Sequence, residues 1–179
     1  MRILFFGTGQ AANRYAKIVK QEFPSSVIDC VSERPTIDTL LYSNVYKFGD
    51  TEFYTNIYRF AIIANVASKH LSSLQSCFRL NIPVLIEKPL CDDYTALSDT
   101  TVEFQQWSES NVAVAYNLRY TVCLQKLREK LLKIAPSDII SVDLAAGSHL
   151  STWRSGRVLS ETASGSKKKW RRCFEGVEP

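Results

Sequence analysis

One stretch near the amino terminus has the residue types and spacing that bind phosphate groups. Gly7-Thr8-Gly9-Gln10-Ala11-Ala12 follows the pattern G-x-G-x-x-[GA]. The first glycine permits a tight turn, the second lets the backbone approach a pyrophosphate, and the small last residue lets a helix pack closely on a strand. A helix that begins here would offer free N–H groups and the positive end of its dipole to the phosphates. The stretch is a candidate dinucleotide site, provided that it joins a strand to a helix.

Further polar residues stand after short apolar runs. Asn65 and His70 follow one run, Glu87-Lys88-Pro89 follows the next, and Asn117 and Arg119 follow a third. These residues form a common site if the runs are parallel strands, because the carboxyl ends of parallel strands meet at one edge of a sheet.

The apolar pattern predicts strands that alternate with helices. Short apolar runs, typical of buried strands, occur at residues 3–6, 27–32, 45–48, 59–65, 83–86 and 112–116. Periodic apolar residues predict helices over residues 10–22, 68–80, 94–108 and 122–134. Strands joined through helices form a parallel sheet covered on both sides. We therefore expect a Rossmann-like, doubly wound α/β fold, with ligands beyond the carboxyl ends of its strands.

The pattern changes after residue 120. We expect residues 1–120 to form an NAD(P)-binding domain and residues 121–166 to form a linker helix and the first part of an α+β substrate domain. Residues 139–146 alternate as a half-exposed strand does, and a single strand does not make a stable sheet. Residues 167–179 form a lysine-rich tail that we expect to be disordered.

The residues after the second predicted strand give conflicting indications about whether the cofactor is NAD or NADP. Ser32-Glu33-Arg34 stands there, where an acidic side chain binds ribose hydroxyls and a basic one accepts the extra phosphate of NADP. Ser32 and Arg34 suit a phosphate, whereas Glu33 opposes it unless its carboxylate is turned away. The sequence predicts NAD or NADP as the cofactor, with a slight preference for NADP.

Taken together, these motifs resemble those of the Gfo/Idh/MocA family, named for glucose-fructose oxidoreductase, inositol dehydrogenase and a rhizopine-catabolism protein. The resemblance runs from Met1 to about residue 166, and Glu87-Lys88-Pro89 is its most specific part. It implies an NAD(P)-dependent oxidoreductase acting on a sugar or nucleotide-linked sugar, in which Lys88 is catalytic. A lysine ammonium beside a developing alkoxide lowers the cost of removing the proton. The alternative is a solvated turn in which Glu87 and Lys88 form a surface ion pair.

The resemblance also implies roles for other residues. Pro89 shapes its turn, the peptide before it is cis in some members, and His70 packs a helix against the cofactor loop rather than acting in catalysis. Trp153 and Arg154 lie in a segment similar to a loop of members that act on nucleotide-linked or surface-polysaccharide sugars, with an ordinary loop as the alternative. The predicted cofactor site thus also includes Asn65, His70, Glu87, Lys88 and Pro89, and the predicted substrate site comprises Asn117, Arg119, Trp153 and Arg154.

The tail departs from the family, which continues into a glycine-rich turn and a segment carrying the catalytic histidine. With permitted codons, the tail from Lys169 read one base later encodes Asn-Gly-Gly-Gly-Val-Leu-Arg-Glu-Leu-Ser-His, which resembles the missing motif. We hypothesise that one extra A in the run encoding Lys167, Lys168 and Lys169 shifted the frame. The resulting truncated chain is expected to bind cofactor and to be weakly active or inactive. The alternatives are a non-catalytic nucleotide-binding or regulatory module, or an on–off switch through slippage of that run.

The composition argues against several other classes. Hydrophobic residues make up 45% and charged residues 22% of the 179 residues, as in a water-soluble protein, and the formal net charge is +4. Five of the positive charges lie in the tail, so no nucleic-acid face is expected. No apolar stretch is long enough to span a membrane, and we expect a cytoplasmic protein whose oligomeric state is open.

The cysteines and histidines predict no metal site. His70 and His149 have no partners at ligand spacing. The cysteines follow no paired spacing and read as small buried hydrophobic residues. They are Cys30, Cys77, Cys91, Cys123 and Cys173.

Overall fold

The structure is a computed structural model that describes residues 1–143 apart from residues 36, 94 and 96–99. The chain divides into two compact units, Met1–Arg119 and Tyr120–Pro179. The first unit contains the sheet and all of the predicted cofactor residues.

A six-stranded sheet forms the centre of the first unit. Its strands are β1 (Arg2–Phe6), β2 (Val27–Val31), β3 (Asn44–Tyr46), β4 (Phe60–Ile63), β5 (Val84–Ile86) and β6 (Val112–Val114). The helices described in this unit are α1 (Gln10–Glu22), α2 (His70–Leu80) and α4 (Val102–Asn111). Short 3₁₀ helices are η1 (Glu52–Thr55), η2 (Ala67–Lys69) and, at the unit boundary, η3 (Asn117–Tyr120).

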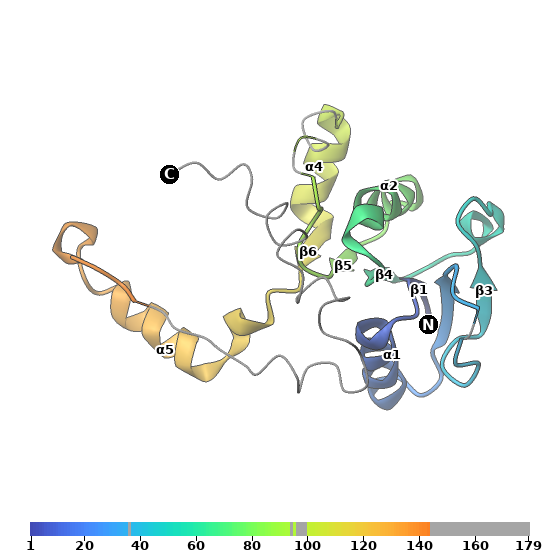
Figure 1. Ribbon diagram of the computed structural model, residues 1–179, viewed down its shortest axis with the longest axis horizontal. Coiled ribbons are helices and arrows are strands. Elements are labelled where there is room, and N and C mark those ends of the chain that lie inside the picture. The colour runs from blue at the N-terminus through green and yellow to red at the C-terminus, as the bar shows by residue number, and fades with distance from the viewer. Residues whose placement is uncertain (36, 94, 96–99, 144–179) are drawn as a thin grey trace, which may run out of the picture. The chain divides into compact units, whose positions relative to one another are not determined.

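All six strands are parallel and lie in the order β3-β2-β1-β4-β5-β6. The chain runs outward from β1 to β3 and then returns to β4, so the strand order reverses between β1 and β4 (Figure 1). Such a reversal opens a ligand crevice at the carboxyl ends of the two strands. The expected doubly wound, Rossmann-like fold is confirmed.

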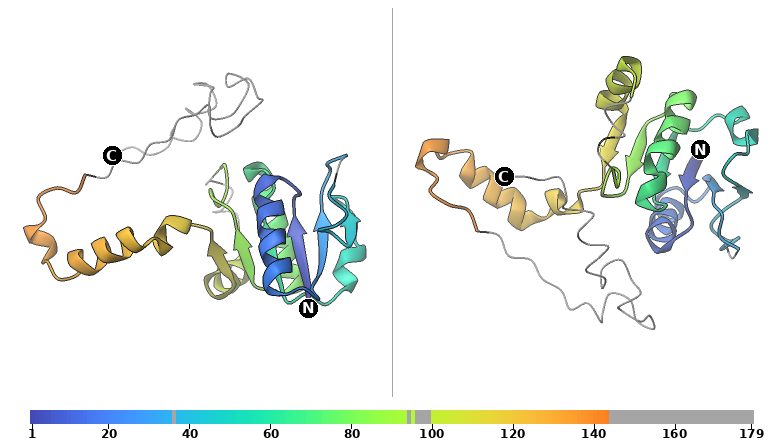
Figure 2. Two further views of the ribbon diagram at one scale, coloured as in Figure 1. Left: turned by 90° about the horizontal axis from the view of Figure 1, so that it is seen from below. Right: turned by 45° about the horizontal axis from the view of Figure 1, so that its top comes forward.

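The central strands bury side chains on both faces of the sheet. Ile3 and Phe5 of β1 pack in one cluster with Ala12 of α1, whereas Leu4 and Phe6 belong to the cluster on the other face. Helix α1 covers the first face, and α2 and α4 cover the second (Figures 1 and 2). Burial on both sides explains why the strands read as continuous apolar runs.

Backbone hydrogen bonds hold the carboxyl ends of the strands level with one another. The residue after every strand except β3 donates its N–H to the last carbonyl of a neighbouring strand. These bonds, 2.8–2.9 Å long, join Ser32 to Tyr46, Gly7 to Val31, Ala64 to Phe6, Glu87 to Ile63, and Ala115 to Ile86. The glycine turn, the Ser32 loop and the Glu87 motif therefore share one edge of the sheet.

Some elements differ in extent from the expectation. Of the helix expected over residues 94–108, Thr95 is helical and residues 94 and 96–99 lie outside the described residues. Helix α4 begins at Val102, because Thr101 has extended backbone angles and its side chain caps the Phe104 N–H at 3.3 Å. The strand expected over residues 59–65 ends at Ile63. The helix expected from residue 68 opens as the 3₁₀ turn η2 and ends against Asn81 in the left-handed conformation.

The cysteines follow the expectation only in part. Cys30 and Cys77 are buried, and burial raises the pKa of the Cys30 thiol to about 12. Cys91 is half-buried. Cys123 is exposed, which contradicts the expectation, because it lies on a helix with no buried residue. Cys173 lies outside the described residues.

The described part of the second unit is helix α5 (Val122–Leu131) followed by the 3₁₀ turn η4 (Pro136–Asp138). Residues 139–143 lie in no strand, although the alternation over residues 139–146 predicts one. A strand needs a neighbour to pair with, and the described residues provide none here. Residues 144–179, with Trp153, Arg154 and the lysine run, lie outside the described residues.

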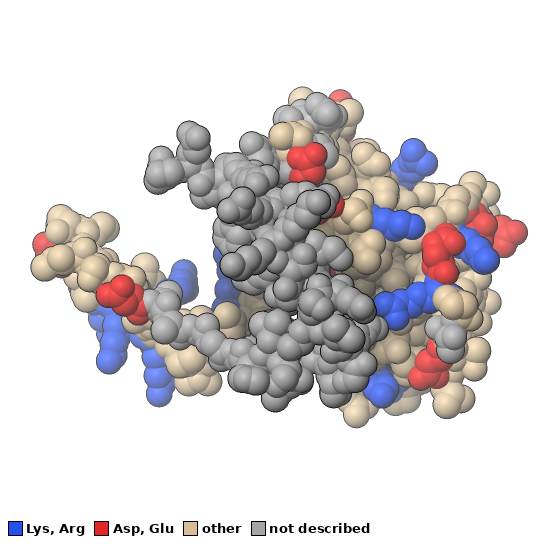
Figure 3. Space-filling model, in the orientation of Figure 1, with Lys and Arg blue, Asp and Glu red and all other residues tan. Residues whose placement is uncertain are grey.

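The described surface shows mixed charge. Lys and Arg side chains alternate with Asp and Glu on the face of the first unit that is turned toward the viewer in Figure 3. None of the helices in the described ranges combines the length and the apolar character needed to cross a bilayer.

Candidate functional site

Gly7 forms the turn at the tip of β1 and packs directly on the end of β4. Its φ of +97° lies in the left-handed region, which favours glycine. A Cβ atom at this position would lie 2.8 Å from both the Cα and the backbone nitrogen of Asn65. The two chain segments that flank the reversal of strand order therefore approach backbone to backbone, as the tight turn in the motif requires.

Gly9 has a different environment from Gly7. It precedes α1 with extended backbone angles, and no side chain caps the first turn of the helix. A Cβ atom here would meet no backbone within 4 Å and would lie 3.4 Å from Nη2 of Arg34. The first turn of α1 thus leaves its N–H groups open toward a space bordered by a guanidinium group.

A cavity of about 320 Å³ lies at the ends of β1, β2 and β4. Such a volume falls at the lower end of the range for small-molecule sites, about 300 to 1,000 Å³. The cavity is lined by Gly7, Thr8, Gly9, Ser32, Glu33, Arg34, Pro35, Phe48, Ala64, Asn65, Val66 and Lys69. It brings together seven of the predicted cofactor residues, whereas Gln10 and Ala11 lie beside it on α1 and Ala12 is buried beneath.

Ser32 links the glycine turn to the loop after β2. The Ser32 and Thr8 hydroxyls lie 2.8 Å apart and both residues are buried, while Ser32 Oγ also accepts the backbone N–H of Arg34 at 3.3 Å. These contacts fix the backbone that carries Arg34. The Arg34 side chain is exposed at the cavity.

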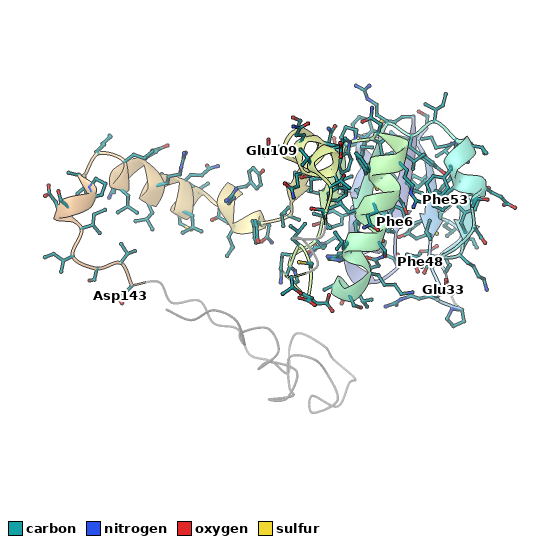
Figure 4. All side chains as sticks on the ribbon, turned by 90° about the horizontal axis from the view of Figure 1, so that it is seen from above. Phe6, Glu33, Phe48, Phe53, Glu109 and Asp143 are labelled. Atoms are coloured by element: carbon teal, nitrogen blue, oxygen red, sulfur yellow. The ribbon has the colours of Figure 1, made fainter. Side chains whose placement is uncertain are left out.

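Glu33 is held by the loop that follows β3. Its Oε1 accepts the backbone N–H of Phe48 at 2.8 Å, and Figure 4 shows Glu33 and Phe48 next to each other at this end of the sheet. The sequence left open whether the Glu33 carboxylate faces the cofactor or is turned away. In the structure this carboxylate accepts a hydrogen bond from the protein backbone.

The sequence analysis missed five residues of the cavity wall: Pro35, Phe48, Ala64, Val66 and Lys69. Lys69 stands at the end of η2, with its Nζ 4.2 Å from the centre of the Phe48 ring. Phe48 also packs on Phe6 of β1, with ring centres 6.4 Å apart. The sequence does show a cation, Lys69, directly before His70 in the loop after the fourth strand. Nothing in the sequence indicates that this lysine contacts Phe48.

His70 holds two parts of the site together from beneath. It is buried, with Nδ1 2.8 Å from the carbonyl oxygen of Pro89 and Nε2 3.3 Å from that of Asn65. A neutral imidazole donates from one nitrogen, so one of these contacts is a conventional hydrogen bond. Both ring nitrogens are thus turned toward the backbone, and the Lys88–Pro89 peptide that His70 supports is cis.

Glu87 and Lys88 form no ion pair within the part of the chain that the structure describes. Glu87 Oε1 instead accepts the hydroxyl of Tyr15 on α1 at 2.8 Å, and Oε2 accepts the backbone N–H of Lys88 at 3.2 Å. The Lys88 side chain is exposed. The sequence analysis did not include Tyr15 in the site, because the partner of its hydroxyl lies 72 positions away in the sequence.

Asn65 presents an unused acceptor at the cavity. Its Nδ2 donates to Ser73 Oγ at 2.9 Å, whereas Oδ1 is buried and has no hydrogen-bond partner. A buried polar atom without a partner is costly. The arrangement fits a ligand that supplies a donor at this point.

Of the predicted substrate residues, the two that the structure describes do not line the cavity. Asn117 and Arg119 lie in η3 after β6 and are exposed, and Arg119 stacks on Tyr116 with its Cζ 5.6 Å from the ring centre. They belong to the same sheet edge as Glu87 but do not line the cavity. Trp153 and Arg154 lie outside the described residues.

Solved structures of dehydrogenases share this fold. The WlbA dehydrogenase from Thermus thermophilus, solved with NAD and UDP-GlcNAcA, matches 75% of this chain and 47% of its own at 18% identity and a TM-score of 0.57. The scyllo-inositol dehydrogenase from Lactobacillus casei, solved with NAD(H) and scyllo-inositol, matches 74% of this chain and 41% of its own at 16% identity and a TM-score of 0.63.

A third similar structure carries the family name that the motifs indicate. It is a Gfo/Idh/MocA family oxidoreductase from Vibrio cholerae, which is 17% identical in sequence and has a TM-score of 0.55. The match covers 74% of this chain and 44% of the Vibrio cholerae chain. No protein-family model matches the sequence, and no curated protein matches it. The likeness establishes a shared fold, and the chain spans less than half the length of these solved structures.

Proposed function

We propose that this chain is the dinucleotide-binding part of an NAD(P)-dependent oxidoreductase of the Gfo/Idh/MocA family that acts on a sugar or a nucleotide-linked sugar. One observation carries the proposal: the glycine turn after β1 and the Glu87-Lys88-Pro89 turn after β5 stand on the same level edge of the sheet, on opposite sides of the β4 end. A dinucleotide lying across that edge would reach both.

The residues at this edge fit a dinucleotide. Gly9 leaves the first turn of α1 open to a pyrophosphate, and Arg34 adds positive charge to the adjoining cavity. Val66 and Pro35 offer apolar surface for a base in the same cavity, and Asn65 Oδ1 awaits a donor. The cavity would hold the adenosine half, leaving the other half to extend toward Lys88.

Lys88 is the residue that we propose for proton transfer. A bound nicotinamide would exchange a hydride with the substrate carbon. The exposed ammonium group of Lys88, which forms no ion pair in the described ranges, would donate a hydrogen bond to the reacting hydroxyl and stabilise negative charge on its oxygen. Glu87 and His70 act through the backbone: they hold the turn that carries Lys88.

Cofactor binding tests the proposal with a variant that spares the fold. Gly9→Ala is expected to retain the wild-type unfolding free energy, since its Cβ meets only a flexible arginine, yet to weaken binding of reduced nicotinamide nucleotide about tenfold or more by intruding on the pyrophosphate. Nucleotide fluorescence during titration measures the affinity. A folded wild-type chain that binds neither NADH nor NADPH would contradict the proposal.

A second function, a nucleotide-binding module without catalysis, is favoured by the position of His70. Both of its ring nitrogens face carbonyl oxygens, so this histidine offers no base to a substrate. Tight nucleotide binding with no sugar-dependent reduction of NAD(P), both in this chain and in a product of the restored reading frame, would support the second function.

A further inference from the structure

Two positive side chains line the cavity without an acidic partner. Arg34 comes from the loop after β2 and Lys69 from η2 after β4, so they enter from different segments of the chain. Among the residues that the structure describes, neither takes part in an ion pair. Two cations and one carboxylate, that of Glu33, leave the cavity wall with an excess of positive charge, which favours an anion.

The nearest acidic residue is tied back by the protein. Glu33 also lines the cavity, but the Phe48 N–H holds its Oε1 at 2.8 Å. An acidic side chain at this position binds NAD when both ribose hydroxyls can reach it and repels the phosphate that NADP carries at the same place. The hydrogen bond fixes Oε1 of the carboxylate at the loop after β3, on the side of Phe48.

Phe48 also positions the second cation. Lys69 Nζ lies 4.2 Å from the ring centre, within cation–π distance, and this is the contact that the structure gives for its ammonium group. The ring is itself fixed against Phe6 of β1. Phe48 thus holds Glu33 through its backbone and Lys69 through its ring, which separates the two charges at one wall of the cavity.

We infer that Lys69 is a second ligand, beside Arg34, for the 2′-phosphate of NADP, and that Phe48 makes the site selective by engaging Glu33 and supporting Lys69. The inference rests on the proposed function and assigns its cofactor: NADP is bound more tightly than NAD. Ser32 completes the subsite, because its hydroxyl fixes the Arg34 backbone.

Binding of NADPH and NADH to the full chain tests the inference. Lys69→Met keeps most of the side-chain length but removes the charge, and it is expected to raise the Kd of NADPH about tenfold while changing that of NADH less than about twofold. Phe48→Leu removes the ring but keeps the backbone N–H, and a smaller loss of NADPH affinity is expected.

Lys47→Met is the matched control. Lys47 is exposed and adjacent to Phe48 but does not line the cavity, so the same loss of charge there is expected to leave both affinities unchanged. Competition experiments in which 2′,5′-ADP or 5′-AMP displaces NADPH isolate the contribution of the 2′-phosphate. In the wild-type chain 2′,5′-ADP is expected to bind more tightly than 5′-AMP, and Lys69→Met is expected to remove this difference in affinity.

The outcomes separate this inference from the proposed function. Binding of NADH at least as tight as that of NADPH overturns the inference and leaves the proposed function standing. Equal effects of Lys69→Met on both nucleotides, or equal effects of Lys69→Met and Lys47→Met, also overturn it. Binding of neither nucleotide by the folded chain overturns both.

Discussion

Tyr15 of α1 donates a hydrogen bond to Oε1 of Glu87, 72 positions later in the chain, over 2.8 Å. The bond joins the helix whose amino terminus would hold the cofactor phosphates to the turn that carries Lys88. Because Glu87 Oε2 accepts the Lys88 backbone N–H at 3.2 Å, the carboxylate couples α1 to this turn. The two halves of the proposed site are therefore linked by a contact that no short motif contains.

Stability is expected to decline at alkaline pH partly through Tyr15. Burial, followed by the hydrogen bond to Glu87, raises the Tyr15 pKa from 10.0 to about 12. Between these values the unfolded chain has released the proton that the native chain retains, so the free energy of unfolding falls as pH rises from about 10 to 12. Burial acts in the same direction on Cys30, whose thiol pKa is raised from 9.0 to about 12.

Urea unfolding between pH 8 and 11 measures this dependence. Tyr15→Phe lacks the titrating hydroxyl and should lose less stability over the interval than wild type, although it starts about 1 kcal/mol lower for want of the hydrogen bond. Parallel profiles for the two proteins would show that Tyr15 does not contribute.

Gly7→Ala should destabilise the fold by at least about 2 kcal/mol, because it combines a left-handed φ with a clash against the Asn65 backbone. Gly49 is the matched control: its φ is +100°, but nothing lies within 4 Å of a Cβ placed there. Gly49→Ala should therefore cost about 1 kcal/mol, the conformational part alone. Thermal and urea unfolding give both values, and equal losses would refute the close approach at Gly7.

His70→Leu should lower the unfolding free energy by about 2 kcal/mol, since it removes a buried imidazole that contacts the carbonyl oxygens of Pro89 and Asn65. Gln75→Ala on the exposed side of the same helix should change stability by less than about 0.5 kcal/mol. If the two variants unfold alike, His70 does not hold the segments together.

The reading frame of the tail is tested in the gene. The frameshift hypothesis predicts a run of A bases in the codons for Lys167, Lys168 and Lys169, and removal of one base should open a frame that encodes the histidine-bearing motif. Sequencing that region decides the matter: without such a frame the hypothesis fails. Variation of the run length among cells would support the switch, and a uniform length would argue against it.

The parallel sheet was predictable from the sequence because burial on both faces leaves a direct trace in it. Ile3 to Phe6 are apolar without alternation, and Gly7 marks the turn that follows. The glycine motif and the turn at Pro89 were likewise predictable, because each depends on a few adjacent residues. The boundary at Val102 was not predicted, because the apolar pattern runs past Thr101 and does not reveal that its side chain caps α4.

Tertiary structure decided which side chains meet. The sequence placed Ser32, Glu33 and Arg34 together and left the direction of Glu33 open; its bond to Phe48 depends on the loop after β3 returning beside β2. Lys69 and Phe48, like Tyr15 and Glu87, come from separate segments that the order of strands brings to one edge. Turns and buried faces can be read from a sequence, because each depends on the residue types of one short segment. Contacts between distant segments depend on which strands pair, because strand pairing determines which loops are neighbours.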